Sequence, residues 1–158
     1  MTDEDRLRLR QLLLDQRWAA LATLGEDGTP SASFVAYVPE PDFSGFLIHV
    51  SRLAAHTRNL LARPRVALGI SAPDDGQGDP QLLERITIHG AVSAIPRGTP
   101  DYLVARARYV ARLPQAEQLF GFEDFVLVRL RPEEARYVGG FARAFTLRGG
   151  GLLQLASP

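Results

Sequence analysis

The first apolar residues of the chain recur at a roughly helical period. Leu7, Leu9 and Leu12 follow Thr2, and Asp5 stands three residues after that threonine. A threonine with an acidic residue at this distance resembles a capping box, in which each side chain binds the other residue's backbone N–H. The pattern predicts an opening helix over about residues 3–17.

The apolar pattern then shortens into strand-like runs separated by turn residues. Asp27-Gly28 is typical of a tight reversal between antiparallel strands, and Pro64, Pro114 and the segment 72–80 mark further breaks. Helices are predicted at 52–62, from Thr99-Pro100 to Leu113-Pro114, and at 115–120. The predicted strands are 18–24, 31–38, 46–50, 66–71, 85–95 and 125–130, and residues 136–147 are apolar and punctuated by glycine.

Most of these strands are joined by turns, and helices are inserted only at intervals. A doubly wound parallel sheet would need a helix after almost every strand. The pattern therefore favours a mainly β fold, an antiparallel sheet closed into a small barrel with flanking helices. We expect one domain over residues 1–158, with the barrel at about 18–147 and a short C-terminal tail.

Composition removes several classes of function. The chain has no cysteine, which excludes thiol catalysis, cysteine zinc sites and disulfides. All 18 basic residues are arginine, and Schiff-base chemistry and Walker-type phosphate loops both need a lysine. The formal net charge is zero, so we expect no nucleic-acid partner. No apolar run is long enough for a signal peptide or a membrane span, so we expect a cytoplasmic protein without a membrane partner.

The segment 46–61 carries the strongest sign of a binding site. An apolar strand ends at Ser51, and a short helical pattern begins there, so Ser51 is expected as the helix N-cap. Arg52, His56, Asn59 and Arg63 would then share one stripe of the helix. Free backbone N–H groups beside a cationic stripe would suit an anionic group such as a phosphate. The alternative is an ordinary amphipathic surface helix.

Metal and hydrolase chemistry have little support in the sequence. His49, His56 and His89 do not occur at a recognised ligand spacing, so structural or phosphate-side roles are favoured and no metal site is predicted. No Gly-x-Ser-x-Gly motif is present, and no serine lies in a pattern with His and Asp.

Three segments in this order and spacing resemble the FMN-binding split-barrel superfamily that includes pyridoxamine 5′-phosphate oxidase. They are residues 28–35 (GTPSASFV), 46–59 and 64–68. The helix pattern 51–60 (SRLAAHTRNL) and the segment 137–145 (YVGGFARAF) are more similar to the HugZ-like haem-utilisation branch than to the oxidase. The likeness covers about residues 7–147.

The resemblance implies a six-stranded antiparallel split barrel that forms a homodimer, with FMN in a groove between the subunits. Ser51 and Arg52 match the pair that holds the FMN phosphate, and Arg85 falls near the flavin ring. The segment 138–145 is a candidate for the partner's contribution to the ring pocket. The full set of expected cofactor-binding residues is Ser33, Phe34, Val35, Val50, Ser51, Arg52, Leu53, His56, Thr57, Asn59 and Arg85.

The function implied is that of an FMN-dependent oxidoreductase acting on a small redox substrate, with no side chain nominated as catalytic acid or base. Pyridoxamine 5′-phosphate oxidase activity is not expected, because the oxidase uses lysines where this chain has Leu53 and Val38. Haem-degrading members of the branch use a histidine in a C-terminal segment, and the last histidine here is His89. The alternatives are a non-enzymatic protein that binds FMN or haem, and a reductase that binds the deazaflavin F420.

Overall fold

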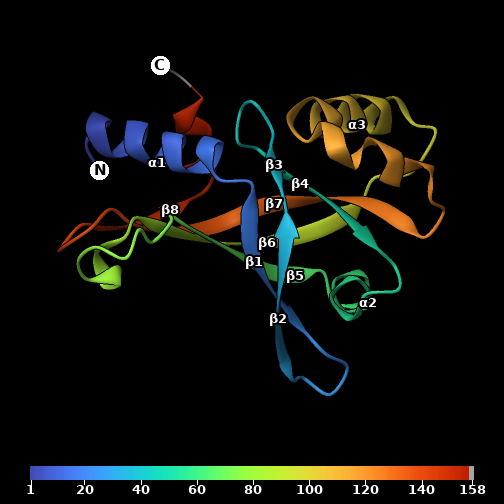
Figure 1. Cartoon of the computed structure of the whole chain (residues 1–158), viewed down its shortest axis with the longest axis horizontal. Helices are drawn as coiled ribbons and strands as arrows, with labels where there is room; N and C mark the ends of the chain where they lie inside the picture. The colour runs from blue at the N-terminus through green and yellow to red at the C-terminus, as the bar shows by residue number, and fades with distance from the viewer. Residues whose placement is uncertain (157–158) are drawn as a thin grey trace.

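The computed structural model describes residues 1–156, and all of its strands join one curled antiparallel sheet (Figure 1). The strand order is β2-β1-β5-β6-β7-β4-β3, with β8 paired to β7. The mainly β prediction is confirmed, but β3 and β8 add two strands to the six expected. The strands are β1 (Trp18–Leu24), β2 (Pro30–Ala36), β3 (Val38–Pro39), β4 (Phe46–Ser51), β5 (Arg65–Ser71), β6 (Arg85–Ala94), β7 (Phe125–Val138) and β8 (Ala144–Arg148).

Three α-helices flank the sheet, and short 3-10 segments complete the connections. The predicted capping box is present, since Thr2 Oγ1 accepts from the Asp5 N–H at 3.2 Å and Asp5 accepts from the Thr2 N–H at 2.8 Å. Figure 1 shows α1 and α3 on one side of the sheet and the β1–β2 hairpin extending on the other. The helices are α1 (Asp3–Asp15), α2 (Ala55–Ala62) and α3 (Pro100–Arg112), with η1 (Pro80–Leu82), η2 (Pro114–Gly121) and η3 (Leu153–Leu155).

Two apolar clusters cover opposite faces of β4. Phe46, Ile48 and Val50 point into the cluster that α1 closes, while Leu47 lies in a second cluster with α3 and η2. Burial on both faces explains why four of residues 46–50 are apolar, with His49 as the exception, and why they do not alternate with polar residues. The first five residues of β4 are accordingly all buried.

The opposite half of the sheet has one face uncovered. Alternate residues of β1, β2, β5 and β6 point away from the core, and Trp18, Leu24 and Phe34 there are 60%, 44% and 63% exposed. We call this surface the open face. It comprises Trp18, Ala20, Ala22, Leu24, Ala32, Phe34, Arg65, Ala67, Gly69, Arg85, Thr87 and His89.

Strand β7 is longer than predicted because it continues through a β-bulge. His89 pairs with Glu134, whereas Gly90 pairs with Pro132, so Glu133 is the extra residue. A Cβ on Gly90 would lie 2.1 Å from the Arg131 carbonyl oxygen, which requires glycine at this close approach. The segment 136–147, given no element from the sequence, contains the end of β7 and most of β8.

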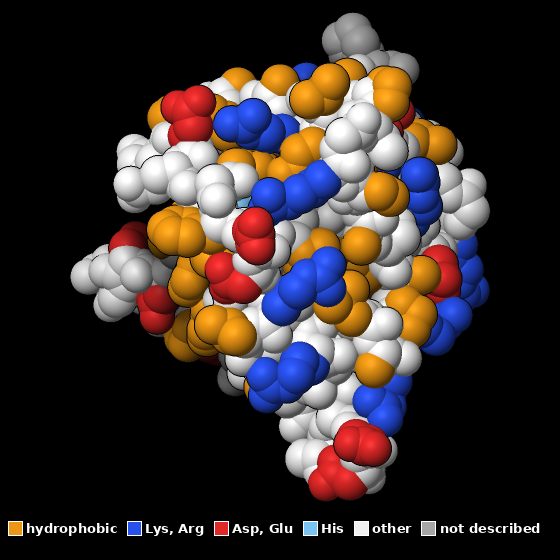
Figure 2. All heavy atoms as spheres, turned by 90° about the vertical axis from the view of Figure 1, so that its right-hand side faces the viewer, with side chains coloured by type: hydrophobic (Ala, Val, Ile, Leu, Met, Phe, Trp, Pro, Cys, Tyr) orange, Lys and Arg blue, Asp and Glu red, His pale blue; other side chains and the backbone are white. Residues whose placement is uncertain are grey.

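Charges of both signs are interspersed on the surface that includes the side of α2 and α3 (Figure 2). No helix within residues 1–156 combines the length and apolar character needed to cross a membrane.

Candidate functional site

The junction between β4 and α2 differs from the predicted anion site. Ser51 is the last residue of β4, and α2 begins four residues later with Ala54 as an N-cap that has no side-chain hydrogen bond. The Ser51 hydroxyl donates to the Asp124 carboxylate at 2.6 Å and accepts from the Leu53 N–H at 3.2 Å. The prediction that Ser51 caps the helix is therefore wrong, because a turn held by Asp124 separates strand from helix.

Asp124 also changes the electrostatics of this junction. Its backbone carbonyl accepts a hydrogen bond from the Arg52 N–H at 2.7 Å, and its carboxylate accepts one from the Ser51 hydroxyl. A phosphate at Ser51 would meet a carboxylate, which opposes the binding of an anion. The two turn residues, Arg52 and Leu53, are exposed, Leu53 by 77%.

The polar stripe of α2 partly serves to attach the helix to the β1–β2 hairpin. Asn59 Nδ2 donates to Thr23 Oγ1 at 3.1 Å, and Arg63 Nη2 donates to the Glu26 carbonyl at 3.3 Å. Burial lowers the pKa of His56, which favours its neutral form. Thr57 is fully buried, and its hydroxyl has no hydrogen-bond partner within the described residues. These contacts fit the amphipathic-helix alternative for Asn59 and Arg63.

The residues predicted on β2 and β4 divide between two faces. Ser33 and Val35 point inward, and Val35 and Val50 belong to the core. Phe34 points outward and stacks on Trp18, with ring centroids 5.9 Å apart and planes 10° from parallel. Arg85 also lies on the open face, so Phe34 and Arg85 are brought to one surface, whereas Ser51 to Asn59 lie beyond it at the β4–α2 junction.

The open face contains two adjoining hollows whose combined volume would accommodate a small molecule or cofactor. One of about 390 Å³ is lined by Trp18, Phe34, Gly69, Arg85 and Thr87, among others. The second, of about 250 Å³, is lined by Ala22, Leu24, Arg65, Ala67 and His89, among others. Together they fall in the range of small-molecule and cofactor sites, about 300–1,000 Å³.

Sequence reasoning did not single out Trp18, Arg65 or His89 as members of a site. A signal for Trp18 was present, because residues 18–24 are apolar at nearly every position although the strand belongs to an antiparallel sheet. Strands with both faces apolar are covered on both sides or have a partner to bind. Nothing local distinguishes His89, whose position depends on pairing with β5 and β7.

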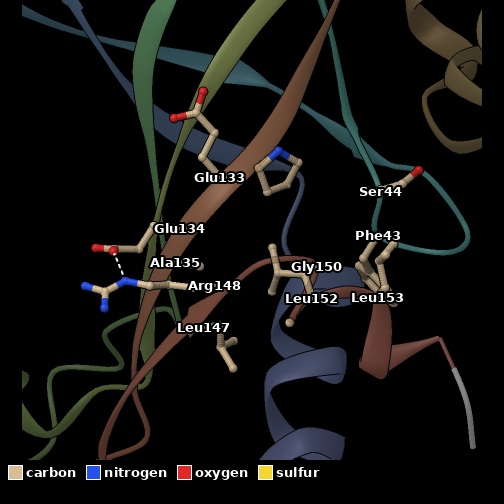
Figure 3. Close-up of a pocket in the computed structure, with 12 residues that line it drawn as sticks. Phe43, Ser44, Glu133, Glu134, Ala135, Leu147, Arg148, Gly150, Leu152 and Leu153 are labelled. Atoms are coloured by element: carbon tan, nitrogen blue, oxygen red, sulfur yellow. Dashed lines mark hydrogen bonds and ion pairs between the residues drawn. The ribbon is translucent and has the colours of Figure 1, made fainter.

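Another cavity, between β7, β8 and the segment before η3, is too small for a cofactor. It has a volume of about 110 Å³ and is lined by Phe43, Leu147 and Leu152, with Glu134 and Arg148 at its side (Figure 3). Within residues 1–156, no cluster of three His, Cys, Asp or Glu side chains is arranged to hold a metal ion.

Comparison with known proteins adds the family and several relatives. The sequence profile of the pyridoxamine 5′-phosphate oxidase family matches residues 7–139. The chloroplastic heme oxygenase HOZ of Arabidopsis thaliana is 39% identical over 120 residues, 75% of this chain and 35% of HOZ. Heme oxygenase HutZ of Vibrio cholerae is 25% identical over 146 residues, 92% of this chain and 82% of HutZ.

A solved structure gives a close match in three dimensions. The heme binding protein of Mycobacterium smegmatis superimposes with a TM-score of 0.86 at 28% identity, over 98% of this chain and 62% of that one. The chain thus spans about a third of HOZ and somewhat less than two thirds of the mycobacterial protein. The curled sheet and these matches agree: the chain belongs to the pyridoxamine 5′-phosphate oxidase family of split-barrel proteins, and it is similar to members of that superfamily that are named for haem.

Proposed function

We propose that this chain binds haem on the open face. The observation that carries the proposal is the uncovered sheet surface, which combines two large aromatic rings, a floor of small residues and Arg85, an arginine without an acidic partner among residues 1–156. Three relatives with haem in their names, HOZ, HutZ and the mycobacterial heme binding protein, support the choice of ligand. This reading replaces FMN oxidoreduction, the main expectation from the sequence, with its haem-binding alternative.

The floor of the open face suits a flat apolar macrocycle. Ala32, Ala22 and Ala67 follow one another across β2, β1 and β5, and Ala20 and Gly69 are neighbours in the next row. A Cβ on Gly69 would meet nothing closer than Ala20 at 3.8 Å, so the fold itself does not require glycine there. Small side chains on an exposed sheet sacrifice the packing that β-branched residues supply. Room for a ligand explains their presence.

The edge of the open face suits the carboxylates of haem. Arg85 Nη1 donates to the carbonyls of Gln81 and Leu83 at 2.8 and 3.0 Å, and no carboxylate is paired with it among residues 1–156. Arg136, opposite Thr87 on β7, donates to Thr146 Oγ1 at 2.9 Å and likewise lacks an acidic partner in that range. Guanidinium groups pair well with propionates because they offer two parallel donors.

We also propose that a second copy of the chain covers the haem. Trp18, Leu24 and Phe34 leave a contiguous apolar surface exposed, and Phe141, in the neighbouring β7–β8 connection, is 85% exposed. Apolar patches of this kind are typical of protein–protein interfaces. A homodimer would enclose the ligand between two open faces and exclude water from it.

FMN has weaker support, because Asp124 lies at the expected phosphate position. Haem, when bound, supplies an iron centre able to bind dioxygen, and the names of HOZ and HutZ extend the proposal to haem breakdown. The chain's own residues would position the ring and pair its propionates.

Titration of the purified chain with haemin and, separately, with FMN tests the proposal. We expect a saturable change in the Soret absorption with haemin at micromolar concentration and little change in the FMN spectrum. A saturable FMN signal without a haemin signal would restore the flavin reading, and the absence of both would remove the open face as a cofactor site.

A further inference from the structure

The three histidines of the chain have different surroundings. His49 is buried in the apolar cluster beneath α3 and η2. The Phe120 ring stacks on its imidazole, with ring centroids 3.8 Å apart and planes 6° from parallel. His56 is half-buried on α2. His89 is exposed on β6, in the hollow that Ala22, Leu24 and Ala67 also line. Only His89 therefore presents its imidazole to the proposed haem surface.

Other residues that ligate haem iron in proteins are absent from the open face. Haem iron takes axial ligands from His, Cys, Met or Tyr. The chain has no cysteine, and Met1, its single methionine, packs against the core. All four tyrosines, Tyr37, Tyr102, Tyr109 and Tyr137, are buried. By elimination, His89 is the ligand available on this surface.

The register of the sheet places His89 beside the small-residue floor. Ala67 pairs with His89, Ala22 pairs with Ala67, and Ala32 pairs with Ala22, so one row crosses four strands. Three strand spacings amount to about 14 Å, so over this width no bulky side chain of the row obstructs the approach of a macrocycle face to the imidazole. The floor and the candidate ligand are thus parts of one surface.

The other neighbour of His89 is an acidic residue of β7. Glu134 pairs with His89 across the strands, and Arg148 holds the Glu134 carboxylate in an ion pair (Figure 3). A carboxylate next to a ligating histidine commonly accepts from the nitrogen that does not bind the metal, which fixes the ring and makes it a better ligand. Glu134 is in the strand position for this role.

The β-bulge at His89 and Gly90 gives this arrangement a structural origin. The extra residue Glu133 shifts the register by one, so that Glu134 instead of its neighbour faces His89. Bulges bend a strand and redirect a side chain, and they often occur next to active sites. Gly90 is required for the close approach of the Arg131 carbonyl.

We propose that His89 is the residue that would ligate haem iron, with Glu134 as its positioning residue. The inference rests on the proposed haem function and adds the residue that would bind the metal. Haem-degrading members of the branch are expected to bind haem through a histidine in a C-terminal segment. The proposal gives this role to a histidine of the sheet instead.

The test compares full-length His89→Ala with wild type and with His56→Ala, each loaded with haemin. We expect wild type and His56→Ala to share one ferric absorption and electron paramagnetic resonance spectrum. His89→Ala should have a shifted Soret band, an altered iron signal and haemin affinity at least about tenfold weaker. Added imidazole should restore the wild-type spectrum to His89→Ala and leave His56→Ala unchanged.

The outcomes separate this inference from the function on which it rests. If wild type shows no saturable haemin binding, the proposed function fails. If wild type binds haemin and folded His89→Ala has the same spectrum and affinity, haem binding stands but His89 is not the ligand. Circular dichroism of each variant identifies loss of fold, and His89→Gln then repeats the comparison with a side chain that retains a polar end.

Discussion

At the scale of single residues, His49 shows how this fold treats an ionisable group that it buries. The ring lies among Tyr109, Phe120 and Phe125, and its two nitrogens have no hydrogen-bond partner within the described residues. Burial lowers the pKa of His49 to about 4, and the positive charge of Arg97 adds to the effect. The native state therefore holds the imidazole neutral.

The buried imidazole predicts that stability falls in mild acid. The unfolded histidine binds a proton below about pH 6.5, whereas the folded one resists protonation until about pH 4. The free energy of unfolding should thus be highest above pH 6.5 and decrease by about 3 kcal/mol as the pH falls to 4.

Urea unfolding of wild type and His49→Phe between pH 4 and 7.5 checks this prediction. The aromatic replacement should remove most of the slope, while His56→Leu should remove a smaller part, because burial lowers the pKa of His56 as well. Equal slopes in wild type and His49→Phe would show that another group controls the acid sensitivity.

At the scale of elements, the sequence predicted correctly those features that are set by residues close together in the chain. The Thr2–Asp5 capping box and the Asp27-Gly28 reversal are as predicted, and β1 has the expected bounds. The start of α2 was wrong because its preceding turn is held by Asp124, which is 73 residues from Ser51. A window along the chain cannot detect that contact.

The second half of β7 and the whole of β8 were not predicted, because they too depend on contacts between distant parts of the chain. Pro132 and the acidic pair Glu133-Glu134 look like the end of a strand, since proline cannot donate to a sheet. Pairing with β6 lets the strand continue through a bulge, and the exposed turn after Val138 then allows β8 to return. Only the assembled sheet supplies these partners. The same holds for His89 as a member of a site.

The contact between Ser51 and Asp124 makes a testable prediction about the β4–α2 junction. Hydrogen bonds to charged groups contribute about 1.5–3 kcal/mol when partly buried. Ser51→Ala and Asp124→Ala should each lower the free energy of unfolding by about 1 kcal/mol or more, and the double variant should lower it by less than their sum.

Denaturant unfolding of the four proteins gives the coupling energy. The Ser44→Ala and Asp74→Ala pair, which shares no contact, provides the additive control. Strict additivity for Ser51 and Asp124 would mean that their hydrogen bond does not fix the turn.

At the scale of the whole molecule, the open face predicts self-association. One chain has a mass of 17.3 kDa, and pairing through Trp18, Leu24 and Phe34 would double it. Phe34→Glu places a charge in the centre of the apolar surface and should shift the protein to the monomer. Leu103→Glu, on the exposed side of α3 at 60% exposure, is the matched control and should stay dimeric.

Sedimentation velocity at several concentrations measures this equilibrium directly. A wild-type monomer throughout the micromolar range would exclude a stable dimer through the open face. Dimers of unchanged stability in Phe34→Glu would place the interface on another surface.

Haem is proposed to lie on the small-residue floor of the open face, and one measurement tests this placement most directly. Haemin affinity is compared for wild type, Gly69→Leu and Ala107→Leu, the last adding the same side chain on exposed α3. The space above Gly69 admits a Cβ, so Gly69→Leu should fold with a free energy of unfolding within about 0.5 kcal/mol of wild type. We predict that Gly69→Leu weakens haemin binding by about tenfold or more, as a bulky side chain fills the site, and that Ala107→Leu does not. Equal haemin affinity in all three folded proteins would contradict the placement of haem on the open face.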